Sequence, residues 1–133
     1  MACYLSHTTV NCGNAYDLSE WWKPLLSYTD IPGDPNEPGH PHCMIIDPET
    51  SQRLLFIETG DADSADKSGI HFDLRPRSGT RDEEVERVRS LGATEVADHR
   101  GTRGPGSGWV TFADPEGNLF CVVRSEQELQ NSH

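Results

Sequence analysis

The segment Asp114-Pro115-Glu116-Gly117-Asn118-Leu119-Phe120-Cys121-Val122 decides the fold, because its opening repeats an earlier part of the chain. The same tripeptide, Asp47-Pro48-Glu49, stands 67 residues before it and is also followed by a β-rich run, Arg53 to Glu58. A tight turn that leads into such a run is typical of a hairpin between two strands. The two copies therefore indicate an internal duplication.

The beginnings of the two halves also match. His7 lies in a strand-like segment that leads into a helix, and His71 lies in another such segment 64 residues later. The offsets of 64 and 67 residues differ by three residues, which a difference in loop length accounts for. The agreement in order, and not the tripeptide alone, supports the duplication.

In the first half, Asn14 or Asp17 can cap a helix whose apolar residues fall on one side. Pro24 stands late in this helix and predicts that it kinks or ends early. The other elements expected are strands at Tyr4 to Cys12, near Ser27 to Ile31, at His42 to Asp47 and at Arg53 to Thr59.

In the second half, Gly69 to Arg75 alternates between apolar and polar residues, as a strand with one buried face does. Thr80 and Glu83 form the pattern of a capping box, and Gly92 supplies a stop for the helix that follows. The glycine-rich segment 101–108 is expected to be a flexible loop or lid. Three more strands are expected at Thr94 to Ala97, Gly108 to Ala113 and Leu119 to Arg124, so both halves have the order β-α-β-β-β.

Length and composition limit the function. A chain of 133 residues fits one domain, 1–133, here with a module at about 1–62 and another at about 67–127. The net charge of −11 argues against binding to nucleic acid, and no apolar run is long enough to span a membrane. Without a signal-peptide pattern or a C-x-x-C motif, the expectation is a cytoplasmic protein with four reduced cysteines.

The chain resembles the vicinal-oxygen-chelate superfamily and is most similar to its glyoxalase-like domain branch. The superfamily includes glyoxalase I, bleomycin-resistance proteins, fosfomycin-modifying enzymes and extradiol dioxygenases. The resemblance implies an α+β fold in which two βαβββ modules form an incomplete, curved eight-stranded barrel around a cavity. It rests on Ser6 to Val10, Leu18 to Trp22, Gly69 to Leu74, Val88 to Thr94, Gly108 to Val110 and Ala113 to Asn118.

The resemblance also implies where a metal ion would bind. In metal-using members the ligands come from the first and last strands of each module, and the first-strand positions here are His7 and His71. The last-strand position of the second module, normally glutamate, is Cys121. The equivalent position in the first module is Ile57 or Glu58, and only Glu58 would offer a carboxylate.

Two histidines with a thiolate or a carboxylate could bind zinc, nickel, iron or manganese and leave a position open for substrate. Histidine and cysteine together favour a softer metal such as zinc, whereas iron oxygenases generally use a carboxylate. Asp73 could bind a ligand amine, act as a base or pair with Arg75. We expect the ligand pocket to be lined by Asp73, Arg75, Trp109 and Glu58.

Two functions remain open at this point. The first is a metal-dependent lyase, isomerase or oxygenase that acts on a small oxygenated substrate, supported by the matched His7 and His71. The second is a metal-free protein that binds or sequesters a cationic or aromatic ligand, as bleomycin-resistance proteins do, supported by Cys121 in place of the carboxylate. Family analogy further implies a homodimer in either case.

Overall fold

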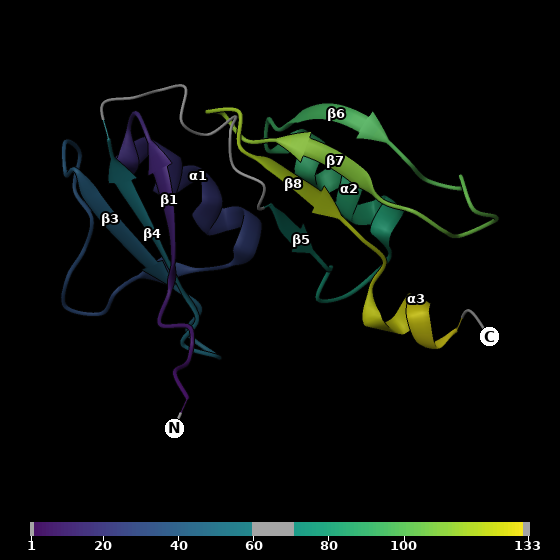
Figure 1. Cartoon of the computed structure of the whole chain (residues 1–133), viewed down its shortest axis with the longest axis horizontal. Coiled ribbons are helices and arrows are strands. Elements are labelled where there is room, and N and C mark those ends of the chain that lie inside the picture. Colours follow the sequence, from purple (N-terminus) through teal and green to yellow (C-terminus); the bar gives the residue numbers. More distant parts are fainter. Residues whose placement is uncertain (1, 60–70, 132–133) are drawn as a thin grey trace. The chain divides into compact units, whose positions relative to one another are not determined.

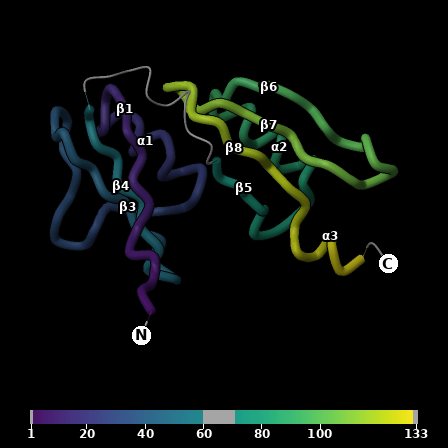
Figure 2. Tube along the Cα trace, viewed as in Figure 1, coloured from purple at the N-terminus to yellow at the C-terminus, as the bar shows by residue number. Residues whose placement is uncertain are grey.

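The computed structural model describes residues 2–59 and 71–131 and divides the chain into two compact units, Met1–Lys67 and Ser68–His133 (Figure 1). Each unit has a four-stranded sheet and a long helix that packs on one of its faces. The path of the chain through each unit, in the order β-α-β-β-β, can be followed in Figure 2. The predicted order of elements is therefore confirmed.

Unit 1, Met1–Lys67, has a sheet with the strand order β1-β4-β3-β2. Strands β1 and β4 run parallel, and the other neighbours are antiparallel. Helix α1 packs against β3 and β4. The elements are β1 (Thr8–Cys12), α1 (Ala15–Leu26), β2 (Thr29–Asp30), β3 (His42–Ile46) and β4 (Arg53–Glu58).

Helix α1 begins where the sequence allows and ends later than Pro24 predicts. Asn14 is the N-cap, and its side chain accepts a hydrogen bond from the Asp17 N–H. The helix continues through Pro24 to Leu26 and ends at Ser27, which has a left-handed backbone conformation. A proline so near the C-terminus removes only one backbone hydrogen bond. Burial of the neighbouring Trp22 and Leu25 against the sheet offsets that loss.

Unit 2, Ser68–His133, has a sheet with the order β5-β8-β7-β6, in which β5 and β8 are parallel. This is the strand arrangement of unit 1 repeated. Its elements are β5 (Phe72–Leu74), α2 (Arg81–Ser90), β6 (Thr94–Asp98), β7 (Val110–Ala113), β8 (Leu119–Val122) and α3 (Glu126–Gln130).

The core of unit 2 lies between α2 and the sheet. Val85 and Val88 of α2 are fully buried, as are Phe112 and Phe120, whose rings stack with centroids 5.9 Å apart. The capping box that the sequence predicts at the start of α2 is present, with Thr80 as the N-cap. Helix α3 was not among the predicted elements, although a second capping box begins it.

The glycine-rich loop between β6 and β7 is anchored by Arg81. The guanidinium Nη1 of this buried residue donates to the carbonyl oxygens of Gly106, Ser107 and Gly108, at 3.3, 2.8 and 3.1 Å. A buried arginine leaves few donors unpaired, so these bonds tie the loop to the start of α2. The predicted flexible lid is therefore wrong for this end of the loop.

The predicted α+β class and the duplicated βαβββ module are confirmed. Within residues 2–59 and 71–131 the eight strands form two separate four-stranded sheets and not one closed barrel, as expected for an open arrangement. The module limits of about 1–62 and 67–127 stay a prediction. In the same part of the chain, no helix is long and apolar enough to cross a membrane.

Candidate metal site

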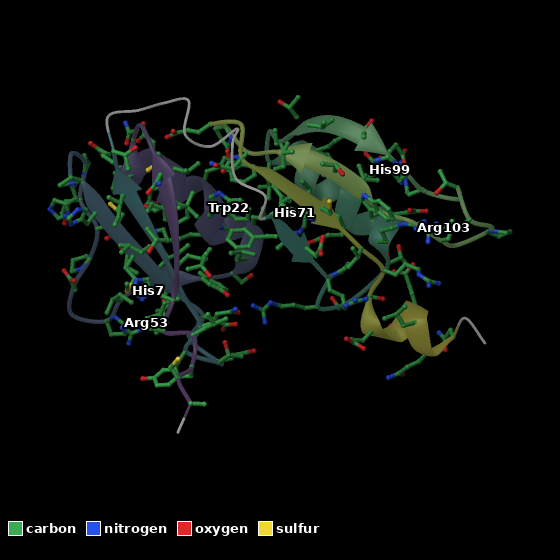
Figure 3. All side chains as sticks on the ribbon, viewed as in Figure 1. His7, Trp22, Arg53, His71, His99 and Arg103 are labelled. Carbon is green, nitrogen blue, oxygen red and sulfur yellow. The ribbon has the colours of Figure 1, made fainter. Side chains whose placement is uncertain are left out.

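The two faces of the sheet in unit 2 differ in what covers them. Phe72, Leu74 and Phe120 point toward the apolar side that α2 covers, because residues two apart along a strand share a face. The residues between them, Asp73 and Cys121, lie on the opposite side, which we call the open face of unit 2. His71 comes two residues before Asp73 (Figure 3) and brings an imidazole to the same part of the unit.

Three side chains with metal-ligating atoms converge on this open face. One ligand atom each from His71, Asp73 and Cys121 lies within 4.8 Å of the other two. The His71 Nε2 is 3.3 Å from the Asp73 Oδ1. Asp73 and Cys121 are direct partners in the parallel pairing of β5 with β8, so their side chains leave the sheet together. Nitrogen, oxygen and sulfur donors are thus available at one point.

The cluster is half open to solvent. The side chains of His71 and Asp73 are 50% and 62% exposed, whereas Cys121 is only 6% exposed. Burial raises the pKa of the Cys121 thiol, and the negative charge of Asp73 acts in the same direction. A hydrogen bond with Thr111, whose Oγ1 is 3.3 Å from the Cys121 Sγ, opposes this rise in the pKa. A cation beside Cys121 would favour the thiolate that metals require.

Arg75 is directed away from the cluster. Its Nη1 donates to the Arg124 carbonyl oxygen, and its Nε is 3.6 Å from the Glu126 carboxylate. The ion pair between Asp73 and Arg75 that the sequence left open is therefore not what the structure contains, since Asp73 pairs with His71. The side chain of Asp73 remains available to a ligand on the open face.

Trp109 adds an apolar surface to the same face. It stands two residues before Thr111, the strand partner of Cys121, and is 37% exposed. The His99 ring lies beside the indole, with ring centroids 4.9 Å apart and a tilt of 37° between the planes. Backbone pairing holds these residues together, because the His99 N–H donates to the Trp109 carbonyl oxygen. They form a small aromatic platform.

Unit 1 carries His7 just before β1, and the side chain of His7 is exposed (Figure 3). Its Nδ1 lies 3.0 Å from the Ser6 Oγ. Its role as a ligand together with His71 and Cys121 stays a prediction.

Glu58 has a structural partner that the sequence did not reveal. Its Oε2 accepts a hydrogen bond from the Ala15 N–H, at 3.1 Å, where α1 begins. Glu58 pairs with the buried Cys12 in the register of β1 with β4, so both lie on the face that α1 covers. Ile57 therefore occupies the opposite, open face of unit 1, and the last strand of that unit presents no carboxylate there.

Sequence reasoning found His71 and Cys121 as ligand candidates but did not place Asp73 among them, and it missed Thr111 and His99. The available signal was the parallel pairing of first and last strands, which sets Asp73 beside Cys121. The register that fixes this pairing, however, depends on how the segment 60–70 connects the halves, and no periodicity predicts that.

A family model described as a glyoxalase-like domain matches residues 7–123, most of the chain. The chain belongs to the glyoxalase-like family. It is thereby a member of the vicinal-oxygen-chelate superfamily, as the sequence resemblance implied. No curated protein matches the chain significantly.

The solved structures that this glyoxalase-like chain resembles support the same fold. The fosfomycin resistance protein FosX of Listeria monocytogenes, complexed with Mn(II) and 1S,2S-dihydroxypropylphosphonic acid, is 20% identical with a TM-score of 0.68, and each chain is covered completely. A glyoxalase-type protein of Bacillus halodurans is 19% identical with a TM-score of 0.61, over 90% of this chain and 93% of that one. A possible glyoxalase of Bacillus cereus is 13% identical with a TM-score of 0.64, over 92% of this chain and 99% of that one.

Proposed function

We propose that this glyoxalase-like protein is a metal-dependent enzyme that acts on a small oxygenated substrate at the open face of unit 2. The observation that carries the proposal is the convergence of ligand atoms from His71, Asp73 and Cys121 within 4.8 Å of one another. In this proposal His71 and Cys121 hold the ion. His7, the equivalent residue of unit 1, stays a predicted ligand.

The comparison with FosX supports the class of ligand. That protein has been described with Mn(II) and a phosphonic acid that bears two adjacent hydroxyl groups. A pair of adjacent oxygens is a chelating group, and a metal with open positions would hold it by both oxygens. We infer that the substrate of this chain also presents adjacent oxygens, such as those of a hydroxyketone or a diol.

The residues present favour a lyase or isomerase over an oxygenase. A bound zinc-like ion would supply Lewis-acid polarisation of a substrate oxygen. Cysteine is a soft ligand that favours zinc, whereas non-haem iron oxygenases use two histidines and a carboxylate. Glu58, the carboxylate that would have supported the iron reading, instead accepts a hydrogen bond from Ala15 at the start of α1.

Acetohydroxamate tests whether the site accepts a chelating substrate. This probe presents two adjacent oxygens, and we expect it to bind the Co(II)-loaded protein and to change its visible absorption spectrum with saturation. Protein treated with a chelator should not bind the probe. A Co(II) spectrum that acetohydroxamate leaves unchanged would mean that the ion has no open position, and the proposed enzyme function would then be wrong.

A second function, metal-free binding of a cationic aromatic ligand, is favoured by one observation. Trp109 is partly exposed beside His99, on the open face that also bears the Asp73 carboxylate. An aromatic ring and a carboxylate together suit a planar cation. Ethidium should then quench tryptophan fluorescence of chelator-treated protein, and Trp109→Ala should abolish binding while Trp21→Phe should not. Ethidium binding that requires metal, or that survives Trp109→Ala, contradicts this second function.

A homodimer in the cytoplasm, which the family resemblance implied, also belongs to the proposal. Light scattering during size-exclusion chromatography should give twice the mass of one chain. A monomer mass at micromolar concentration would remove the dimer from the account without affecting the metal site.

A further inference from the structure

Asp73 stands where it can replace the carboxylate that the family position lacks. The last strand of the second module carries Cys121 at the position at which metal-using relatives carry glutamate. Asp73 is the direct partner of Cys121 on the neighbouring parallel strand, on the same face. Neighbouring strands are only about 4.8 Å apart, so a carboxylate displaced by one strand can still reach the same point above the sheet.

The distances agree with a shared ion. Zinc lies about 2.0–2.1 Å from nitrogen and oxygen ligands, so two such ligands of a tetrahedral ion are about 3.3 Å apart. The observed separation of the His71 Nε2 and the Asp73 Oδ1 is 3.3 Å. The Cys121 Sγ completes a set of three atoms within 4.8 Å of one another. Small rotations of these side chains would bring all three onto one ion.

The surrounding contacts leave Asp73 available to a cation. Its ion-pair partner among the described residues is His71, whereas Arg75 is held by Glu126 and by the Arg124 carbonyl oxygen. Thr111 contacts Cys121 from the other neighbouring strand and fixes the direction of its sulfur atom. Such contacts are typical of residues that orient a metal ligand.

Resting on the proposed function, we propose that Asp73 is a direct metal ligand and that His71, Asp73 and Cys121 form a complete zinc-preferring set within unit 2. A mixed set of one nitrogen, one oxygen and one sulfur donor with a thiolate prefers Zn(II) over Mn(II). His7 is then dispensable for binding the ion. The alternative is an ordinary histidine–aspartate pair on an exposed surface, with no role toward a metal.

Calorimetric titration of Zn(II) into the reduced, chelator-treated full chain tests this assignment. The wild type should bind about one ion per chain, and Mn(II) should bind at least about 100-fold more weakly. Asp73→Asn keeps the shape of the side chain and should weaken Zn(II) binding by about 100-fold or more, since even outer residues cost about 10–100-fold. Asp98→Asn, which removes a carboxylate from β6 of the same sheet outside the cluster, is the matched control and should bind as the wild type does. His7→Ala should change the affinity by less than about 10-fold.

The outcomes separate the two proposals. If Asp73→Asn binds Zn(II) as the wild type does, or if the control weakens binding equally, the assignment of Asp73 is overturned while metal dependence stands. A large loss of affinity in His7→Ala overturns the claim that unit 2 suffices. A wild-type chain that binds no Zn(II) overturns the proposed function itself. Circular dichroism of each variant checks that it is folded, which the 62% exposure of the Asp73 side chain leads us to expect.

Discussion

Replacement of His71 by alanine is expected to abolish stoichiometric zinc binding and, with it, any metal-dependent turnover. His71 supplies the only imidazole of the described cluster, and a neutral imidazole is among the strongest zinc ligands in proteins. Its loss should weaken zinc binding by about 100-fold or more, beyond the cost of removing an outer residue. The variant should still fold, because the His71 side chain is 50% exposed.

Zinc content after gel filtration and the thermal melting curve are the two measurements. His42→Ala, which removes another exposed histidine from a strand of unit 1, is the matched control and should retain zinc. The melting temperature of both variants should stay near that of the wild type in the absence of metal. Full zinc occupancy in His71→Ala would show that the cluster is not the metal site.

Gly108→Ala should destabilise unit 2 more than any other glycine substitution discussed here. Gly108 has a φ of +91°, and a Cβ at this position would lie 2.0 Å from the carbonyl oxygen of His99. A left-handed conformation costs a non-glycine residue about 1–2 kcal/mol, and the forced displacement of the backbone adds about 1–3 kcal/mol. The shift would also disturb the bond from Arg81 to the Gly108 carbonyl oxygen. We therefore expect a loss of about 2–5 kcal/mol in the free energy of unfolding.

Urea denaturation followed by circular dichroism measures this loss. Gly101→Ala is the control in the same loop, since Gly101 has a φ of +76° but nothing within 4 Å of the added Cβ. It should lose only about 1–2 kcal/mol, the cost of the backbone conformation alone. Equal losses in the two variants would mean that the close approach of the His99 carbonyl contributes nothing to the requirement for glycine.

The duplicated fold could be predicted because its signals are local and occur twice. The Asp-Pro-Glu turns, the alternation through Phe72 and the capping box at Thr80 each depend on residues close in sequence. Pro24 misled the prediction, because burial of neighbouring residues against the sheet outweighed its local effect. Helix α3 was missed because five residues leave almost no periodicity to detect.

The site was only partly predictable, because its geometry depends on contacts between distant segments. Repeat equivalence was enough to select His71 and Cys121. Whether Ile57 or Glu58 faces the open side depends on strand register, and the structure gives Glu58 a partner at the start of α1. The anchoring of the glycine-rich loop by Arg81 is likewise a contact across 25 residues or more of sequence.

The most direct test of the central claim is X-ray absorption at the zinc edge of the reconstituted protein. The account predicts one sulfur ligand at about 2.3 Å and nitrogen or oxygen ligands at about 2.0–2.1 Å. The sulfur contribution should disappear in Cys121→Ser and persist in Cys43→Ser, which removes a buried thiol outside the cluster. A wild-type spectrum with nitrogen and oxygen ligands alone would contradict a metal centre built on Cys121.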